Sequence, residues 1–470
     1  VKIIGANAFK DCDTFTSITL PQSLTSIEDL AFAYCDALQN INIPQNVTNI
    51  GVSAFLQCKS LTSITIPSGV TSIKTATFAY CTSLKSIELP DHLVSIEGSA
   101  FTLCTSLKSV VIPAEVTSVG FHAFAVCTSL ESVAIPMNVT SVGNSAFDGC
   151  TSLKAVFAKE GVPLESASVP SDAAKIYYKV EDQSYLSIIK AHTGTQAGIE
   201  CIEIPKTIGG LDVRVIKEEA FRDCGNIKKI ILPDSIREIQ NSAFSYCTSL
   251  ESINISAGVT SIGNYAFDSC TSLESINIPV GITSIGDYAF EDCTALKSVV
   301  IPESVTSIGY AAFSRCDKLV SINIPMGVSM ISNNTFENCT SLTAINIPTS
   351  VRQIGDESFM GCTALTSIIV PEGVTTIGKR VFHHCTALES VSLPDSLTEI
   401  KGNAFQDCPA LKSINIPKGV TSIEAFVFSD CQALADVTLP EGIQGIDMCA
   451  FDSCPSLETI VLPPSTTYVR

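Results

Sequence analysis

Cysteine is the residue type in this sequence with the widest capacity for chemistry, and the 470-residue chain has 20 of them. Thiolates attack electrophiles, pair as disulfides and bind soft metals. Eighteen of these cysteines, however, recur in steps of 23 residues, first from Cys12 to Cys150 and again from Cys224 to Cys454. Only Cys201 and Cys449 stand outside this series. A fixed period of this length is typical of stacked structural repeats.

The cysteines of the 23-residue series, the ladder cysteines, allow three interpretations. Equivalent Cα atoms on neighbouring turns would lie ~5 Å apart, which is within reach of a disulfide. Two observations argue against disulfides between neighbouring turns. The stacked side chains would point in parallel directions, and the first block has seven cysteines, so that one would stay unpaired. No turn contains the C-x-x-C or Cys/His tetrad that is typical of zinc sites. We favour buried thiols that act as small apolar side chains, with disulfides as the first alternative and metal binding as the second.

Cysteines and histidines outside that series are the remaining candidates. Cys201 is expected at an outward-facing strand position, where its thiol is either unreactive or available for intermolecular pairing or redox chemistry. Cys449 is expected to pack on the convex side. His383-His384-Cys385 is the best local cluster, but Cys385 is a ladder residue that faces inward. The two histidines are therefore interpreted as a solvated corner.

Nothing in the sequence assembles a recognisable active site. Five histidines allow no Ser-His-Asp arrangement at repeat-defined positions, and no phosphate-cradling glycine loop occurs. Aspartate and glutamate lie mainly at the variable positions around each Phe-x-x-Cys turn, as in Gly286–Cys293, and are interpreted as a solubilising convex surface. We predict a non-enzymatic protein with no catalytic residue, no metal site and no cofactor.

The elements that position these residues repeat with the same period. A phenylalanine lies three residues before every ladder cysteine, and an apolar residue, usually leucine, lies three after it. The alternating segment Ser63–Ile66 then predicts a short strand with one face inward, which Pro67 ends because it lacks an N–H. The segment Val70–Ile73 is expected to cross the far side. Ala-Phe-x-x-Cys predicts a tight helical or 3₁₀ turn.

No single turn can bury its own aliphatic side chains, so stability must come from stacking on neighbours. The predicted fold class is a β-rich, right-handed superhelix with 23-residue turns, a parallel concave sheet and short helical or 3₁₀ turns on the convex side. At ~4.8 Å per stacked strand, about twenty turns would form an arc on the order of 100 Å long.

The repeat resembles a known family. The segment Leu-x-x-Ile-x-Ile-Pro matches the leucine-rich-repeat pattern, and the full turns Leu273–Cys293 and Leu296–Cys316 look like BspA-like (treponemal-type) repeats. The resemblance covers all but roughly residues 159–200. It implies a curved leucine-rich-repeat solenoid, mostly secreted or surface-attached, that acts in adhesion to host proteins or other cells. The family has no shared catalytic motif, so the resemblance implies no active-site residue.

The regular period is interrupted once, which predicts three segments. Residues 1–158 form a first array, residues 159–200 an irregular insert, and residues 201–470 a second array. The two arrays are either separate, with a bend between them, or parts of one solenoid with two irregular turns. We favour one continuous stack, because the repeat phase survives as far as Pro205.

Two features of the interruption predict local structure. Ile176–Val180 and Tyr185–Ile189 read as strands joined by the turn at 181–184, a hairpin candidate that resembles the unit often opening an array in this family. The stretch from Cys150 to Cys224 is five residues longer than three 23-residue periods. These five extra residues fall after Pro205, within Thr207–Val213.

The concave sheet is the surface on which we expect recognition. Its first outward column is mostly serine and its second is rich in asparagine, and such short side chains lose little rotamer entropy on contact. Apolar residues replace the polar ones at Val111, Ala134, Phe157 and Ile231. We predict that these four form a partner-binding or docking patch, since exposed apolar patches with polar rims mark contact sites. The alternative is that the insert at 159–200 covers them.

Composition excludes several partner classes. Lys+Arg 28 against Asp+Glu 47 gives a net charge of −19, which disfavours nucleic acid and anionic lipid. No apolar run approaches the ~20 residues of a membrane span. The chain starts without Met or a signal segment, and both ends fall inside a repeat. We therefore expect a mature product or a fragment that continues, or whose ends contact other molecules.

The functional prediction is a non-enzymatic surface or secreted protein that adheres to a protein or glycan ligand, from a host or another cell surface, through its concave face. The alternative is a structural solenoid that self-associates. No membrane insertion is expected within this segment.

Overall fold

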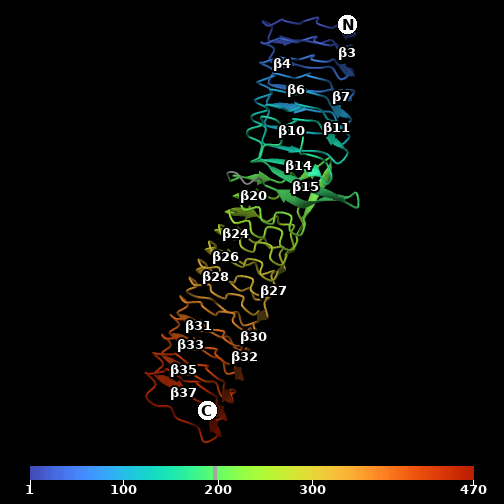
Figure 1. The fold of residues 1–470 in the computed structure, drawn as a ribbon. Helices are drawn as coiled ribbons and strands as arrows, with labels where there is room; N and C mark the ends of the chain where they lie inside the picture. The colour runs from blue at the N-terminus through green and yellow to red at the C-terminus, as the bar shows by residue number, and fades with distance from the viewer. Residues whose placement is uncertain (194–197) are drawn as a thin grey trace. The chain divides into compact units, whose positions relative to one another are not determined.

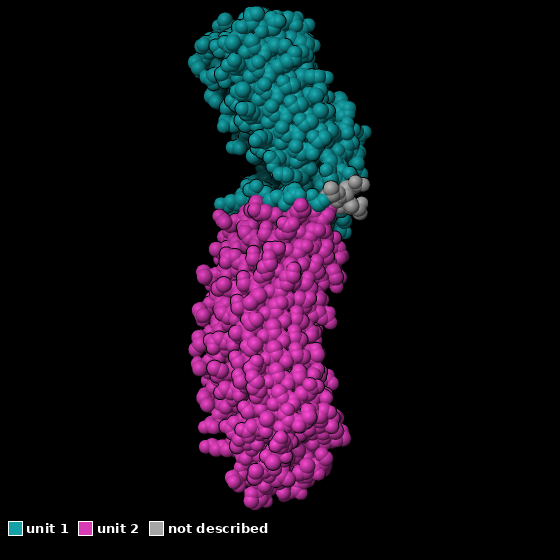
Figure 2. All heavy atoms as spheres, turned by 90° about the vertical axis from the view of Figure 1, so that its left-hand side faces the viewer, with its two compact units in different colours: residues 1–214 teal, residues 215–470 magenta. Residues whose placement is uncertain are grey.

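The computed structural model describes residues 1–193 and 198–470. It divides into two compact units, residues 1–214 (unit 1) and residues 215–470 (unit 2), which Figure 2 colours separately. Within each unit, turns of about 23 residues stack on one another, and most turns carry two short strands on different sides (Figure 1). We name the strand after the ladder cysteine the A strand and the one nearest the next Phe-x-x-Cys turn the B strand.

A strands form parallel ladders in which partner residues are one period apart, as Ser63 and Ser86 or Ser275 and Ser298 are. In unit 1 the A strands are β2 (Ser17–Ile18), β4 (Asn40–Ile41), β6 (Ser63–Thr65), β8 (Ser86–Glu88), β10 (Ser109–Val111), β12 (Ser132–Ala134) and β14 (Ala155–Lys159). In unit 2 they are β20 (Lys229–Ile231), β22 (Ser252–Asn254), β24 (Ser275–Asn277), β26 (Ser298–Val300), β28 (Ser321–Ile322), β31 (Ser367–Ile369), β33 (Ser390–Ser392), β35 (Ser413–Asn415) and β37 (Asp436–Thr438).

The segment expected only to cross the far side forms a second parallel ladder, again with partners one period apart, such as Ser72 and Ser95. In unit 1 the B strands are β1 (Ile3–Ile4), β3 (Ser26–Ile27), β5 (Asn49–Ile50), β7 (Ser72–Ile73), β9 (Ser95–Ile96), β11 (Ser118–Val119) and β13 (Ser141–Val142). In unit 2 they are β21 (Glu238–Ile239), β23 (Ser261–Ile262), β25 (Ser284–Ile285), β27 (Ser307–Ile308), β29 (Met330–Ile331), β30 (Gln353–Ile354), β32 (Thr376–Ile377), β34 (Glu399–Ile400), β36 (Ser422–Ile423), β38 (Gly445–Ile446) and β39 (Tyr468–Val469).

The Ala-Phe-x-x-Cys segment is not helical, which corrects the predicted helical or 3₁₀ turn; none of the described residues is assigned to a helix. Ser53 (φ 54°) and Gln57 (φ 61°) are in the left-handed region, and the same two positions are left-handed in most other turns. Left-handed residues stop a helix from propagating. They also turn alternate N–H groups toward the next turn, so that Phe55 N–H donates to Thr77 O at 2.9 Å. The segment is thus a run of β-turns.

The core of each unit is a column of stacked phenylalanine rings, as predicted. Phe55 and Phe78 in unit 1 have ring centroids 5.5 Å apart with planes 5° from parallel. Phe267 and Phe290 in unit 2 are 5.4 Å apart and 3° from parallel. All four side chains are fully buried. Each ring therefore covers the next, and removing one exposes two neighbours.

The ladder cysteines are mostly buried, in agreement with the favoured interpretation. Cys58 Sγ donates a hydrogen bond to Phe32 O of the preceding turn at 3.2 Å, and the same bond recurs along both units. All 20 cysteines are free thiols. Burial raises the pKa of Cys81 to about 12, because the thiolate would be desolvated. Each of these thiols therefore fills space in the core and donates a hydrogen bond to a backbone carbonyl.

The interruption contains the predicted hairpin, with longer strands. β15 (Ala174–Glu181) pairs antiparallel with β16 (Tyr185–His192), and β15 adds in parallel to β14, with Ala155 opposite Ala174. Tyr178 on β15 is fully buried and its hydroxyl donates to Ile135 O at 2.6 Å. This bond ties the hairpin to the regular turn before it.

A second hairpin occupies the place where the five excess residues were predicted. β17 (Ile202–Glu203) precedes β18 (Thr207–Ile208), which pairs antiparallel with β19 (Leu211–Ile216). Gly209 and Gly210 have φ of +57° and +82°. A two-residue turn with both residues left-handed is the type that glycine favours. The boundary between the units lies within β19, and the division into two arrays or one solenoid stays a prediction.

Replacing Phe267 by alanine tests the phenylalanine column. We expect Phe267→Ala to lower the free energy of unfolding by about 3–5 kcal/mol, because it leaves a cavity between two rings. Phe121→Ala, at a side chain that is 54% exposed, should cost less than about 1 kcal/mol. Urea unfolding followed by circular dichroism measures both, and equal costs would contradict the proposed column.

Thiol titration with DTNB tests the ladder cysteines. In the native protein at pH 8 we expect fast reaction only at the half-buried Cys12, Cys201, Cys449 and Cys454, because the other sixteen thiols are buried. In denaturant all 20 should react. Cys201→Ser should remove one fast equivalent. A shortfall of thiols in denaturant would support the disulfide alternative.

Candidate functional site

The outward face of the A strands, the A-strand face, is exposed and uncharged over most of unit 2. In β24, Ser275 and Asn277 are exposed while Ile276 between them is buried, and β35 has the same pattern. Serine occupies the first outward position in β22, β24, β26, β28, β31, β33 and β35. Each of these turns therefore presents short side chains to solvent, as the sequence predicted.

Two of the asparagines on this face have a structural role. Asn254 Nδ2 donates to Leu232 O at 2.9 Å, and Asn254 Oδ1 accepts from Leu232 N–H at 2.9 Å. Asn323 makes the same pair of bonds to Ile301, at 2.7 and 2.8 Å. These side chains satisfy the peptide group that follows the end of the preceding A strand. They hold neighbouring turns together and are not available to a ligand without loss of those bonds.

The four residues predicted to form an exposed apolar patch do not share one environment. Val111 is 82% exposed and Ala134, its neighbour in register, is half-buried. Phe157 is only 1% exposed, so the prediction of an exposed side chain there was wrong. Ile231 is half-buried and belongs to unit 2. Val111 and Ala134 line a common cavity.

A later part of unit 1 lies beside this face of the A strands. Both faces of β14 are buried from Ala155 to Ala158. Residues 198–210 line cavities together with the A strands β10, β12 and β14. A Cβ atom at Gly209 would lie 3.6 Å from Pro136 Cβ and 3.7 Å from Ala114 Cβ. The segment beside this face therefore includes the end of the predicted insert, residues 198–200, and continues to residue 210.

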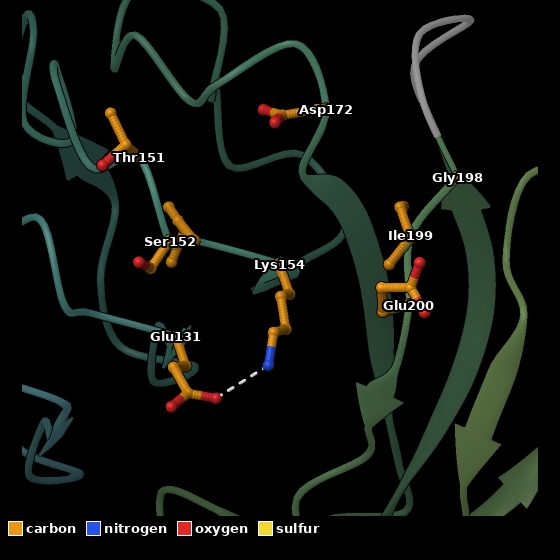
Figure 3. Close-up of a pocket in the computed structure, with 9 residues that line it drawn as sticks. Glu131, Thr151, Ser152, Lys154, Asp172, Gly198, Ile199 and Glu200 are labelled. Carbon is orange, nitrogen blue, oxygen red and sulfur yellow. Dashed lines mark hydrogen bonds and ion pairs between the residues drawn. The ribbon is translucent and has the colours of Figure 1, made fainter.

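The space between that segment and the A strands is a groove, the unit 1 groove, made of three cavities of about 340, 300 and 460 Å³. The first lies between Ser152 and Lys154 on one side and Ile199 and Glu200 on the other (Figure 3). The second is lined by Ser132 and Cys201, among others. The third is lined by Val111, Ala134, Pro113, Pro205 and Ile208, among others.

One ion pair lies at the junction of the first two cavities. Lys154 Nζ contacts Glu131 Oε2 at 2.8 Å (Figure 3). The hydrogen bond from Lys154, followed by its charge, lowers the pKa of Glu131 below its usual value. Asp172 and Glu200 lie on other sides of the same cavity. Glu131 is therefore ionised at neutral pH, and the cavity has an excess of carboxylates.

The other candidates for chemistry are separate from one another. Cys201 is half-buried beside the groove, and Cys449 is half-buried in a left-handed position of its turn. His384 is exposed and contacts Asp407, while the half-buried His383 contacts Gln406 O at 3.2 Å. Within residues 1–193 and 198–470, no group of three or more His, Cys, Asp or Glu side chains is placed to hold a metal ion.

A buried acid in unit 2 departs from the predicted solubilising surface. Asp268 is buried and accepts hydrogen bonds from Ser245 Oγ at 3.1 Å and Ser269 Oγ at 3.0 Å. Burial raises its pKa. On the next turn, burial and then the charges of Asp268 and Asp292 raise the pKa of Glu291 to about 7. The acids in this part of the turns are therefore not all freely solvated.

The fold and the repeated residues define a leucine-rich-repeat solenoid. The sequence matches the family described as BspA type Leucine rich repeat region (6 copies) at residues 2–131, 71–167, 187–318, 283–411 and 352–470. The chain belongs to this family, which supports a protein-binding solenoid and indicates no catalytic class. In the described part of the chain, no helix has the length and apolar character that crossing a membrane requires.

Several solved structures are similar to this chain. A leucine-rich repeat protein from Bacteroides ovatus is 28% identical, with 86% of this chain and 87% of that chain covered and a TM-score of 0.42. A leucine rich cell surface protein from Faecalibacterium prausnitzii is 32% identical, covering 68% and 82%, with a TM-score of 0.32. The T. pallidum leucine rich repeat protein is 26% identical, covering 50% and 87%, with a TM-score of 0.30. No curated protein matches the chain.

The raised pKa of Glu291 predicts a pH-dependent loss of stability. The folded carboxyl keeps its proton up to about pH 7, whereas the unfolded one loses it near pH ~4.3. Stability should therefore fall as pH rises between these values. Glu291→Gln, which stays neutral, should be more stable than the parent at pH 8 by about 1 kcal/mol, because solvent screens a partly buried carboxyl, and similar to it at pH 4.

The control is Glu274→Gln, at an exposed carboxylate whose pKa is lowered by its hydrogen bond from Lys297. It should not gain stability at pH 8. Thermal unfolding at pH 4, 6 and 8 measures all three proteins. A Glu291→Gln variant with the parent's pH profile would show that the pKa of Glu291 does not change on folding.

Proposed function

We propose that this chain belongs to a secreted or cell-surface protein that adheres to a protein or glycan ligand through the A-strand face. The observation that carries the proposal is the exposed, uncharged row of short side chains along successive A strands of unit 2. Membership in the BspA type family supports a protein-binding role. The proposed location, secreted or on the cell surface, is the one that the resemblance to this family implies.

The face has the physical properties of a recognition surface. Serine side chains offer donors and acceptors with little rotamer entropy to lose. Val300, 74% exposed, and Ile369, 71% exposed, add aliphatic contacts among these polar groups. They occupy equivalent positions three turns apart, roughly 14 Å at ~4.8 Å per turn. Apolar side chains within a polar surface supply binding energy, while the polar groups around them supply specificity.

Charges next to the face are neutralised by pairing between turns. Lys297 Nζ contacts Glu274 Oε2 at 2.8 Å, and Lys412 Nζ contacts Glu389 Oε2 at 2.6 Å. Each of these residues immediately precedes an A strand. In a chain with a net charge of −19, this pairing limits the repulsion that an acidic ligand would meet.

A binding array of purified extracellular-matrix proteins, plasma proteins and glycans tests the proposal. We expect at least one ligand to bind the full chain, and a double variant, Val300→Arg with Ile369→Arg, to weaken that binding at least tenfold. Val280→Arg is the matched control, because Val280 is 81% exposed and lies in the connection between β24 and β25. It should leave binding unchanged.

Two outcomes would overturn the proposal. One is the absence of binding to every component of the array. The other is binding that both variants affect equally. Concentration-dependent growth in light scattering that the double variant abolishes would instead support the alternative of a self-associating scaffold.

A further inference from the structure

The unit 1 groove is not used by the function proposed for the A-strand face. All residues that line it lie in unit 1. Its three cavities form a series, because Glu131 and Lys154 line both the first and the second, and Ser109 and Ser132 line both the second and the third. The groove is therefore continuous along one wall.

The other wall follows the chain in order. Residues 198–200 line the first cavity, 201–203 the second, and Pro205 with residues 207–210 the third. This wall contains the strands β17 (Ile202–Glu203) and β18 (Thr207–Ile208). A groove with strands along one wall has a shape that suits an extended segment of another chain.

The third cavity has the character of an aliphatic side-chain pocket. Val111, Ala134, Pro113, Pro205 and Ile208 contribute apolar surface to it. Its volume of about 460 Å³ lies within the range of ligand-binding cavities. Val111 remains 82% exposed, so this apolar wall is accessible to an incoming side chain.

Carboxylates outnumber cations along the groove. Lys108 and Lys154 are the lysines in its lining, and Lys154 is paired with Glu131. Glu115 also contacts His92 Nδ1 at 3.2 Å. The carboxylates that line the three cavities are Asp91, Glu115, Glu131, Asp172, Glu200 and Glu203. A ligand that enters the groove therefore meets a negative potential, which favours cations.

We propose that the unit 1 groove binds an extended segment of a partner protein in which Lys or Arg residues alternate with aliphatic residues. The aliphatic side chain enters the cavity beside Val111 and Ala134, and the cationic side chains lie along the carboxylates. Alternation suits the site because neighbouring side chains of an extended segment point to opposite sides. The proposal rests on the protein-binding function and adds a second, chemically distinct surface to it.

Fluorescence anisotropy with the full chain tests the groove. The probe is a fluorescein-labelled decapeptide of alternating lysine and leucine, and its counterpart alternates glutamate and leucine. We expect the lysine peptide to bind at least tenfold more tightly, with a difference that shrinks as salt rises. Val111→Arg should weaken its binding at least tenfold. Val280→Arg, an equal change of charge at an 81% exposed valine of unit 2 that lies outside the A strands, should leave it within twofold.

A second pair of variants separates the groove from general attraction to an acidic protein. Glu203→Lys reverses an exposed charge that lines the groove, whereas Glu251→Lys reverses an exposed charge in unit 2. Only the first should weaken the lysine peptide. Equal losses in both, or equal affinity for the two peptides, would overturn the groove proposal and leave the A-strand proposal standing. If no ligand of the array binds but the lysine peptide shows the expected differences, the A-strand proposal is overturned and the groove proposal stands.

Discussion

The structure depends on bonds and contacts between turns rather than within them. Phe55 N–H donates to Thr77 O of the following turn, its ring stacks on that of Phe78, and the Cys58 thiol donates to Phe32 O of the preceding turn. Each of these interactions requires a residue one period away. The inward positions are therefore restricted to a few residue types, whereas the outward positions make none of these core contacts and can contribute to ligand binding.

The 23-residue period was sufficient to predict the core. Each strand pairs in parallel with the strand one period away, so equivalent inward residues lie side by side. The period did not predict the left-handed turns. Residues as different as Leu30, Tyr34 and Val126 adopt positive φ there, so the conformation follows from hydrogen bonding to the next turn and has no composition signal. The Gly209-Gly210 pair was a local signal for a hairpin turn, and it could have located the second hairpin.

The burial of Phe157 could not be predicted from the repeat. Its position in β14 matches that of the exposed Val111 in β10, and counting residues treats the two as equivalent. The turn that carries Phe157 is followed by a hairpin and then by residues 198–210, which lie beside the A strands and whose path is unrelated to the 23-residue period. Periodicity predicts what a regular turn exposes, but a covering segment from outside the period follows its own contacts.

This comparison suggests why an irregular segment adds a kind of recognition that regular turns lack. On a regular A-strand face, each outward side chain has the same neighbours above and below, so the surface is shallow and binding must be spread over many weak contacts.

A segment that lies across the face supplies a second wall. Opposed walls surround a ligand side chain, remove more of its surface from water and strengthen nearby charges by lowering the local dielectric. The unit 1 groove combines two such walls with an excess of carboxylates. Selectivity for a cationic, partly aliphatic segment is therefore a consequence of breaking the repeat at this one place.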